Sequence, residues 1–267
     1  MQAAGSRPRP TFFVRKGKVF MLKIRVGNGV WWGVLVGTAL GTWGLQQALK
    51  RCTQEDARMV LFIIGCATLL LYVVQRLFMF KDPVFLEEYG SRRKDLLVQL
   101  LPLHMCYAGL ILTLVGLYFR IEAILAFSFY TGALGALFAI LAPDGYNQDK
   151  NLLFPPIFFF YFLHMMLICL YCNIGFTGLF TFGWKAAASA VGIAVLMAAV
   201  MHVVNLIGHR LDMPSMNYFY TMDPGGSGLL ERMWTWIPCR FFYIVVPAVP
   251  VFFAWAMLLT WLQHLLT

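Results

Sequence analysis

Charged side chains are scarce in this chain. Asp, Glu, Lys and Arg make up only 12% of its 267 residues, whereas 60% are hydrophobic. Soluble domains carry about twice that share of charge, so the composition excludes an ordinary soluble domain. The aromatic content of 16% suits a protein that places Trp and Tyr at the boundary between lipid and water.

Several motifs with a specific chemistry are also missing. The sequence has no Walker A loop, no glycine-rich dinucleotide loop, no paired carboxylates and no H-x-x-x-H or H-E-x-x-H pattern. No RNA-binding or DNA-binding motif accompanies the formal net charge of +9, and the basic residues lie in turns between apolar runs. We therefore expect no cofactor, no metal and no nucleic-acid partner, and the positive charge suits anionic lipid headgroups.

The six cysteines do not form the pattern of a small secreted domain. Four of them lie inside apolar runs, namely Cys66, Cys106, Cys169 and Cys172. The last two form a C-x-x-C, but they lie in a predicted membrane span and lack the strand–helix–strand context of a thioredoxin-like motif. We interpret this pair as small packing residues.

What the chain has in abundance is long apolar runs. A run of about 20 apolar residues can cross the hydrocarbon core, because a helix satisfies all of its own backbone polar groups. Seven runs qualify, and the first is the weakest because it is rich in glycine. They are Val26–Ala48, Met59–Phe80, Leu96–Tyr118, Ile121–Ala142, Leu152–Cys172, Ala186–Ile207 and Phe241–Leu262. The sequence thus predicts an all-α, polytopic transmembrane helix bundle with about seven spans.

The predicted membrane domain, residues 26–267, follows a basic arm of residues 1–25. The first apolar run is long and has no small-residue cleavage site after it, so we interpret it as an uncleaved anchor. Most basic residues near span ends fall on the side of the arm, which predicts a cytoplasmic N-terminus and an outside C-terminus. The connection from about residue 209 to 240 is rich in Pro and Gly, and we expect a structured loop at best.

The first run has a glycine at every fourth position: Gly29, Gly33, Gly37 and Gly41. This spacing places the four glycines on one face of a helix, where they allow close backbone approach. The face suits packing inside the bundle or between two copies of the chain, and a homo-oligomer is therefore one expectation. A ligand contact is the alternative.

Polar side chains inside spans are costly, so they are the first candidates for a site. At about 1.5 Å of rise per residue, Cys106 and His164 lie roughly 15 and 18 Å from the cytoplasmic side. His202 and Asn205 lie in the same half of the bilayer. His104 is two residues from Cys106 and so points to nearly the opposite face. We interpret Arg76, at the inner end of the second run, as a structural residue whose side chain extends to the interface.

The pair of Cys106 and His164 favours nucleophilic acyl transfer. A thiol is a weak nucleophile until it becomes a thiolate, and a neighbouring histidine can act as the base. Two other interpretations stay open. Cys106 is a small residue of a type often buried for packing, and Cys106, His164 and His202 together could hold zinc.

Several short motifs in a fixed order resemble one family. They are LPLHMC at Leu101–Cys106, LAPD at Leu141–Asp144, FFFYFLH ending at His164, Asn205, NYFY at Asn217–Tyr220, and Pro224. Through them, the region from about Asp82 to the C-terminus resembles the bacterial YwaF-like integral membrane proteins. The resemblance implies a place in the bacterial cytoplasmic membrane. The segment between Asn205 and Asn217 is longer than the family turn, which implies a different cytoplasmic mouth.

That family looks related to a eukaryotic acyltransferase that moves acyl chains between ether phospholipids without coenzyme A. The resemblance implies that Cys106 is the nucleophile, that His164 is the histidine, and that membrane phospholipids are the partners. His104 and Asn205 match motif positions without an assigned role. We name both, together with His202 and Asn217, as candidate substrate-binding residues.

Two functions of different classes are consistent with this sequence. The first is a lipid-modifying enzyme, an acyltransferase or lipase that uses Cys106 and His164. The second is a transporter or receptor for a lipid or small molecule, although no acidic residue lies deep in a span and no half-length helices suggest an inverted repeat. A structural subunit held by the glycine face is a third interpretation.

Overall fold

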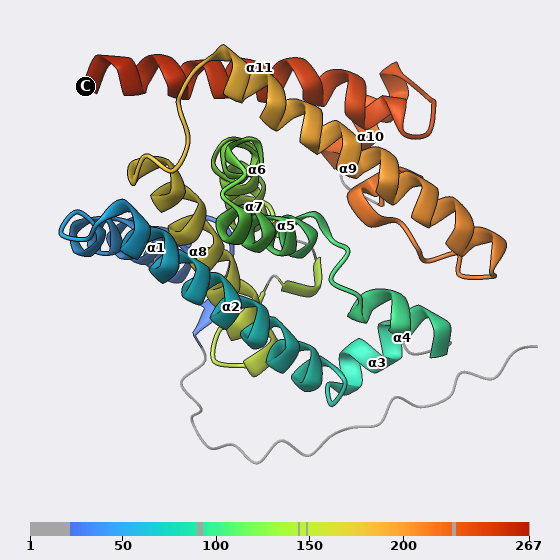
Figure 1. Cartoon of the computed structure of the whole chain (residues 1–267). Helices are drawn as coiled ribbons and strands as arrows, with labels where there is room; N and C mark the ends of the chain where they lie inside the picture. The colour runs from blue at the N-terminus through green and yellow to red at the C-terminus, as the bar shows by residue number, and fades with distance from the viewer. Residues whose placement is uncertain (1–21, 90–92, 144, 148, 226–227, 267) are drawn as a thin grey trace, which may run out of the picture.

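Helices build nearly all of the structure, a computed structural model that describes residues 22–89, 93–143, 145–147, 149–225 and 228–266 (Figure 1). Two short strands, β1 (Lys23–Ile24) and β2 (Lys150–Asn151), pair antiparallel. The predicted all-α class is thereby confirmed. Most of the predicted basic arm, residues 1–21, lies outside the described residues.

Each of the seven apolar runs contains helix. Six of them correspond mainly to one helix each, namely α1 (Gly29–Leu49), α2 (Gln54–Met79), α5 (Met105–Phe119), α8 (Pro155–Phe176), α9 (Trp184–Arg210) and α11 (Phe242–Leu266). The fourth run forms one continuous segment of α6 (Glu122–Phe127), the π-helical η1 (Ser128–Gly132) and α7 (Ala133–Leu141). Five are long and apolar enough to cross a membrane, namely α2, the α6–α7 segment, α8, α9 and α11. Helix α1 has the length but not the hydropathy, because of its Gly, Trp and Gln content, and α5 has only 15 residues. The count of seven spans and the orientation stay predictions.

The third predicted span is wrong as a single helix. It divides into α4 (Arg93–Leu100), which follows the short α3 (Pro83–Tyr89), and α5, with a break at residues 101–104. Pro102 lies in the break, because proline lacks the N–H that a continuous helix needs and its ring crowds the preceding turn. His104 is extended (φ −64°, ψ 146°) and is the N-cap of α5. Cys106 is therefore in the first turn of a helix and not ten residues inside one.

The long connection after α9 contains more regular structure than the sequence predicts. A single 3-10 turn, η3 (Tyr218–Tyr220), is followed by the nine-residue α10 (Gly228–Trp236). A second 3-10 turn, η2 (Gly145–Asn147), lies before β2. The predicted loop therefore ends in a helix that packs against α11.

Helix α8 is the central element. It packs against α1, α2 and α7 and is buried along most of its length, whereas α9 packs against α6 and α11. In Figure 1, α1, α2 and α8 form one group and α9, α10 and α11 form another, with α5, α6 and α7 between them. The short α5 thus stands where the two groups meet.

The glycine face of α1 is partly used inside the chain. A Cβ added at Gly37 or Gly41 would lie 3.3 Å from the Cε atom of Met165 or 3.3 Å from the Sγ atom of Cys169, both on α8. An added Cβ at Gly29 or Gly33 would meet nothing within 4 Å. Packing inside the bundle therefore accounts for two of the four glycines, and an oligomer interface stays a prediction for the other two.

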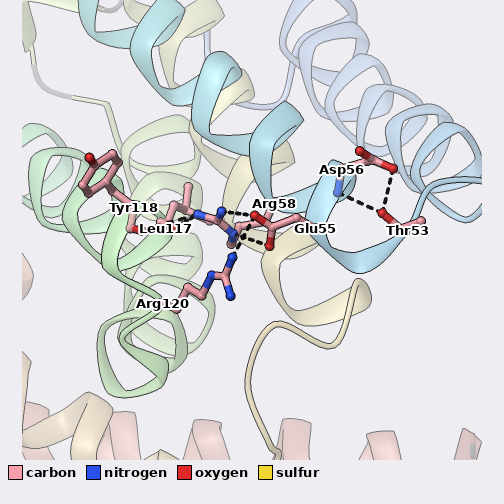
Figure 2. Close-up of polar contacts among 7 residues, drawn as sticks. All are labelled: Thr53, Glu55, Asp56, Arg58, Leu117, Tyr118 and Arg120. Atoms are coloured by element: carbon pink, nitrogen blue, oxygen red, sulfur yellow. Dashed lines mark hydrogen bonds and ion pairs between the residues drawn. The ribbon is translucent and has the colours of Figure 1, made fainter.

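A buried arginine joins the start of α2 to the end of α5 (Figure 2). Arg58 is 9% exposed; its guanidinium donates to the Glu55 carboxylate and to the carbonyl oxygen of Leu117. Arg120, in the left-handed conformation (φ 59°) after the last turn of α5, donates to the same carboxylate at 2.9 Å. The backbone carbonyls at the end of α5 are thus satisfied from α2, and α5 is held in place.

Candidate functional site

The nucleophile candidate Cys106 lies in the first turn of α5. The N-cap residue His104 makes no side-chain capping hydrogen bond, and its carbonyl accepts from the N–H groups of Tyr107 and Ala108 at 3.0 Å each. Within the described residues, the N–H groups of Met105 and Cys106 have no acceptor. The first N–H groups of a helix carry a partial positive charge, so negative charge is favoured at this place.

The first turn of α5 lies against the face of α8 that carries His164. The hydroxyl of Tyr171, seven residues and thus two turns after His164, donates to the carbonyl oxygen of Cys106 at 3.3 Å. The ring of Tyr107, the residue after Cys106, meets the ring of His164 edge-on, with 6.2 Å between centroids. The fold therefore brings the two candidate catalytic residues into neighbouring turns, but no hydrogen bond joins the Cys106 thiol to His164 in the described structure.

The backbone fixes the tautomer of His164. Its side chain is buried, and its Nδ1 atom lies 2.7 Å from the carbonyl oxygen of Phe160. Because a carbonyl can only accept, Nδ1 carries the proton in the neutral ring, and Nε2 keeps its lone pair. A histidine in this state can take a proton at Nε2.

Arg76 is half-buried and lies beside two aromatic rings, and its predicted reach to the interface stays a prediction. The guanidinium carbon lies 4.7 Å from the ring centroid of Tyr72 and 5.8 Å from that of Tyr107. The Nε atom is buried without a hydrogen-bond partner. The sequence signal for this residue is a lone arginine inside an apolar run with no Asp or Glu one helical turn away on either side.

His104 faces away from α8. Its ring meets the ring of Tyr218 edge-on, with 5.3 Å between centroids, and the Tyr218 hydroxyl donates to the carbonyl oxygen of Val98 at 2.5 Å. Burial raises the pKa of the Tyr218 phenol to about 12. His104 thus lies between the first turn of α5 and the loop that follows α9.

The polar residues of α9 hold that loop. Both N–H groups of the Asn205 amide donate at 2.9 Å, one to the Tyr218 carbonyl and one to the Thr221 hydroxyl, and its oxygen accepts from the Tyr218 N–H at 3.0 Å. The Nδ1 atom of His202 lies 3.1 Å from the same hydroxyl of Thr221. Asn217 is also engaged, with its amide donating to Asp223. These residues act on the loop in this structure, and their predicted contact with substrate stays a prediction.

The zinc interpretation finds no support in the geometry. His202 binds the loop after α9, whereas His164 lies on α8 against the first turn of α5. Among the described residues, no three His, Cys, Asp or Glu side chains gather as metal ligands would.

Two cavities lie away from Cys106 and His164. One of about 420 Å³ opens between the start of α6 and the start of α9, beside Glu122 and Lys185. The other, of about 390 Å³, lies between α1, α7 and α8, with Thr38 and Thr42 in its wall. Neither cavity is lined by Cys106 or His164.

Comparison with known proteins supports a membrane protein family for this fold. No curated protein and no solved structure matches the chain. The model of the TMEM164 family, a membrane protein family, matches residues 23–266, which is nearly the whole chain and all of the helices described above. This match and the five apolar helices make the chain an integral, multi-pass membrane protein. The chain therefore belongs to the TMEM164 family.

Proposed function

We propose that this protein is a membrane-embedded phospholipid acyltransferase that works through Cys106 and His164 without coenzyme A. One observation carries the proposal. Cys106 stands at the start of a helix, beside the face of α8 that presents a buried histidine with its basic nitrogen free. An activated thiol needs a base nearby and a place that favours negative charge, and the proposal assigns these roles to His164 and to the first turn of α5.

The reaction begins at the acyl ester of a phospholipid. His164 Nε2 takes the proton of the Cys106 thiol, and the sulfur attacks the ester carbonyl. The N–H groups of Met105 and Cys106 would donate to the negative charge that then develops on oxygen. The C–O bond breaks, the imidazolium returns the proton to the leaving lysophospholipid, and a thioester remains on Cys106.

A second lipid completes the cycle. The hydroxyl of a lysophospholipid acceptor attacks the thioester, His164 takes the hydroxyl proton, and the thiolate that leaves is protonated again. Water in place of the acceptor would make the protein a lipase. This chemistry requires the Cys106 sulfur and His164 Nε2 to come closer together when the substrate binds. Catalytic hydrogen bonds that are long in the unliganded enzyme commonly shorten in this way.

His104, His202, Asn205 and Asn217 serve the site indirectly in this proposal. The three last named hold the loop after α9, and His104 packs its ring against that loop through Tyr218. The loop would shape the entrance for the lipid headgroup on the predicted cytoplasmic side. We further propose the bacterial cytoplasmic membrane as its place, on the resemblance of its motifs to YwaF-like proteins.

The test follows the acyl group. Purified protein in vesicles receives a phospholipid labelled in one acyl chain and an unlabelled lysophospholipid, and transfer is measured by mass spectrometry. Cys106→Ala should abolish transfer, and His164→Ala should lower it by about 10²- to 10⁴-fold, the usual contribution of a general base. Cys172→Ala is the matched control, because this thiol is also half-buried in the bundle. Full transfer by Cys106→Ala would overturn the mechanism.

Alkylation separates the enzyme from a transporter or receptor. The Cys106 thiol should react with an acyl-mimicking electrophile faster than the other five cysteines and should lose this advantage in His164→Ala. Equal reactivity of all six cysteines would favour the non-enzymatic function.

A further inference from the structure

Arg76 is a half-buried charged group beside the rings of Tyr72 and Tyr107. It makes no ion pair with any described acidic side chain, and its Nη1 atom donates to the sulfur of Met79 at 3.2 Å. A thioether is a weak acceptor, and a guanidinium has five N–H donors in all. A cation placed among apolar side chains in this way is costly unless an anion reaches it.

The two tyrosines beside Arg76 do not supply that anion. The Tyr72 hydroxyl donates to the carbonyl oxygen of Leu100 at 3.0 Å, and the Tyr107 hydroxyl donates to the side-chain oxygen of Gln75 at 3.4 Å. Both phenols are therefore neutral donors that turn their ring faces to the guanidinium. A guanidinium that lies over aromatic rings can still offer N–H groups to an oxygen ligand.

We propose that Arg76 binds a phosphate group inside the bundle, carried by a phospholipid headgroup or present as free phosphate. Arginine matches the oxygens of a phosphate with two parallel hydrogen bonds, which a planar, stacked guanidinium is prepared to make. The position supports a lipid as the source, because Arg76 and Cys106 flank the same residue, Tyr107. The glycerol backbone joins phosphate and acyl ester through only a few bonds, so one lipid can reach both.

The inference rests on the proposed function for the choice of a phospholipid, but its test measures binding and not turnover. The full chain carrying Cys106→Ala is stripped of lipid in detergent, and its thermal unfolding is followed with and without added ligand. The ligands are phosphatidylcholine, diacylglycerol with the same acyl chains, and inorganic phosphate. A ligand that binds only the folded protein raises Tm, by about 5 to 10 °C at a hundredfold excess over Kd.

Phosphatidylcholine should raise Tm and diacylglycerol should not. Arg76→Gln should lose this difference, Arg76→Lys should keep part of it because it retains a charge, and Arg51→Gln, a basic residue exposed after α1, should keep all of it. A full shift with inorganic phosphate alone would support the phosphate site and assign it to free phosphate. The same lipid shift in Arg76→Gln as in the parent would overturn the proposal.

The ligand-free Tm distinguishes binding from a structural role. Removal of a half-buried charge that has no described acidic partner should leave Tm unchanged or raise it. A lower Tm for both Arg76→Gln and Arg76→Lys without ligand would mean that the guanidinium holds the bundle together, and the proposal would fail. Because the binding test uses the Cys106→Ala chain, its outcomes do not depend on acyl transfer. The phosphate site and the acyltransferase activity can therefore be refuted separately.

Discussion

Removal of the Asn205 side chain should release the loop after α9. Asn205 is fully buried and makes three hydrogen bonds to that loop, two to Tyr218 and one to Thr221, all between 2.9 and 3.0 Å. At about 1 kcal/mol for each bond, Asn205→Ala should lower the free energy of unfolding by about 3 kcal/mol. A chain of this length loses about 2 to 4 °C of Tm per kcal/mol, so we expect a decrease of about 6 to 12 °C.

A thiol-reactive fluorogenic maleimide measures this change in detergent as the increase in signal on unfolding, when the half-buried Cys169 and Cys172 become fully accessible. The matched control is Ser189→Ala on the same helix, where the hydroxyl donates to the carbonyl of Lys185 one turn earlier. That change should stay within about 0.5 kcal/mol of the parent. Limited proteolysis should cut the loop of Asn205→Ala first. A melting temperature of Asn205→Ala within about 2 °C of the parent, together with an uncut loop, would show that the hydrogen bonds of Asn205 do not hold the loop after α9.

Two further stability changes follow from the packing. Arg58→Met should lower the free energy of unfolding by about 2 kcal/mol in the same assay, because the carbonyl of Leu117 loses its charged donor; an unchanged Tm would contradict that role. Gly175→Ala should cost about 1 to 3 kcal/mol, since an added Cβ would lie 2.4 Å from the ring of Phe129. Gly192→Ala, also in a helix interior but with nothing within 4 Å of an added Cβ, should be neutral or stabilising by up to about 1 kcal/mol, and equal losses in the two variants would refute the packing argument.

The helices were predictable because lipid imposes a simple rule on sequence. A segment that crosses the hydrocarbon core must be apolar over about 20 residues, and such runs are visible without any knowledge of their partners. The predicted run Ala186–Ile207 lies within α9, and Phe241–Leu262 begins one residue before α11. Hydropathy does not show where a proline interrupts a helix. The predicted span Leu96–Tyr118 therefore includes Pro102, which lies in the break between α4 and α5.

The surroundings of the candidate site residues could not be predicted from the sequence. Depth along the spans placed Cys106 and His164 near one another, whereas the helix start at Cys106 depends on the break at Pro102. Arg76 looked like an interfacial residue because its distance from the end of the run is short. Its guanidinium lies over the rings of Tyr72 on α2 and Tyr107 on α5. The contact with Tyr107 depends on how the two helices pack, which the sequence of one helix alone does not reveal.

The brevity of α5 has a consequence for the surrounding bilayer. Its 15 residues rise about 22 Å, against a hydrocarbon thickness of about 30 Å. Ile111 and Val115 on α5 are exposed, so lipid tails meet this helix directly. If α5 crosses the bilayer as the sequence predicts, hydrophobic mismatch would thin the nearby leaflet. In the proposed mechanism, the thinned leaflet would bring lipid ester groups closer to the first turn of α5, so that a lipid could present its carbonyl to Cys106 without leaving the bilayer.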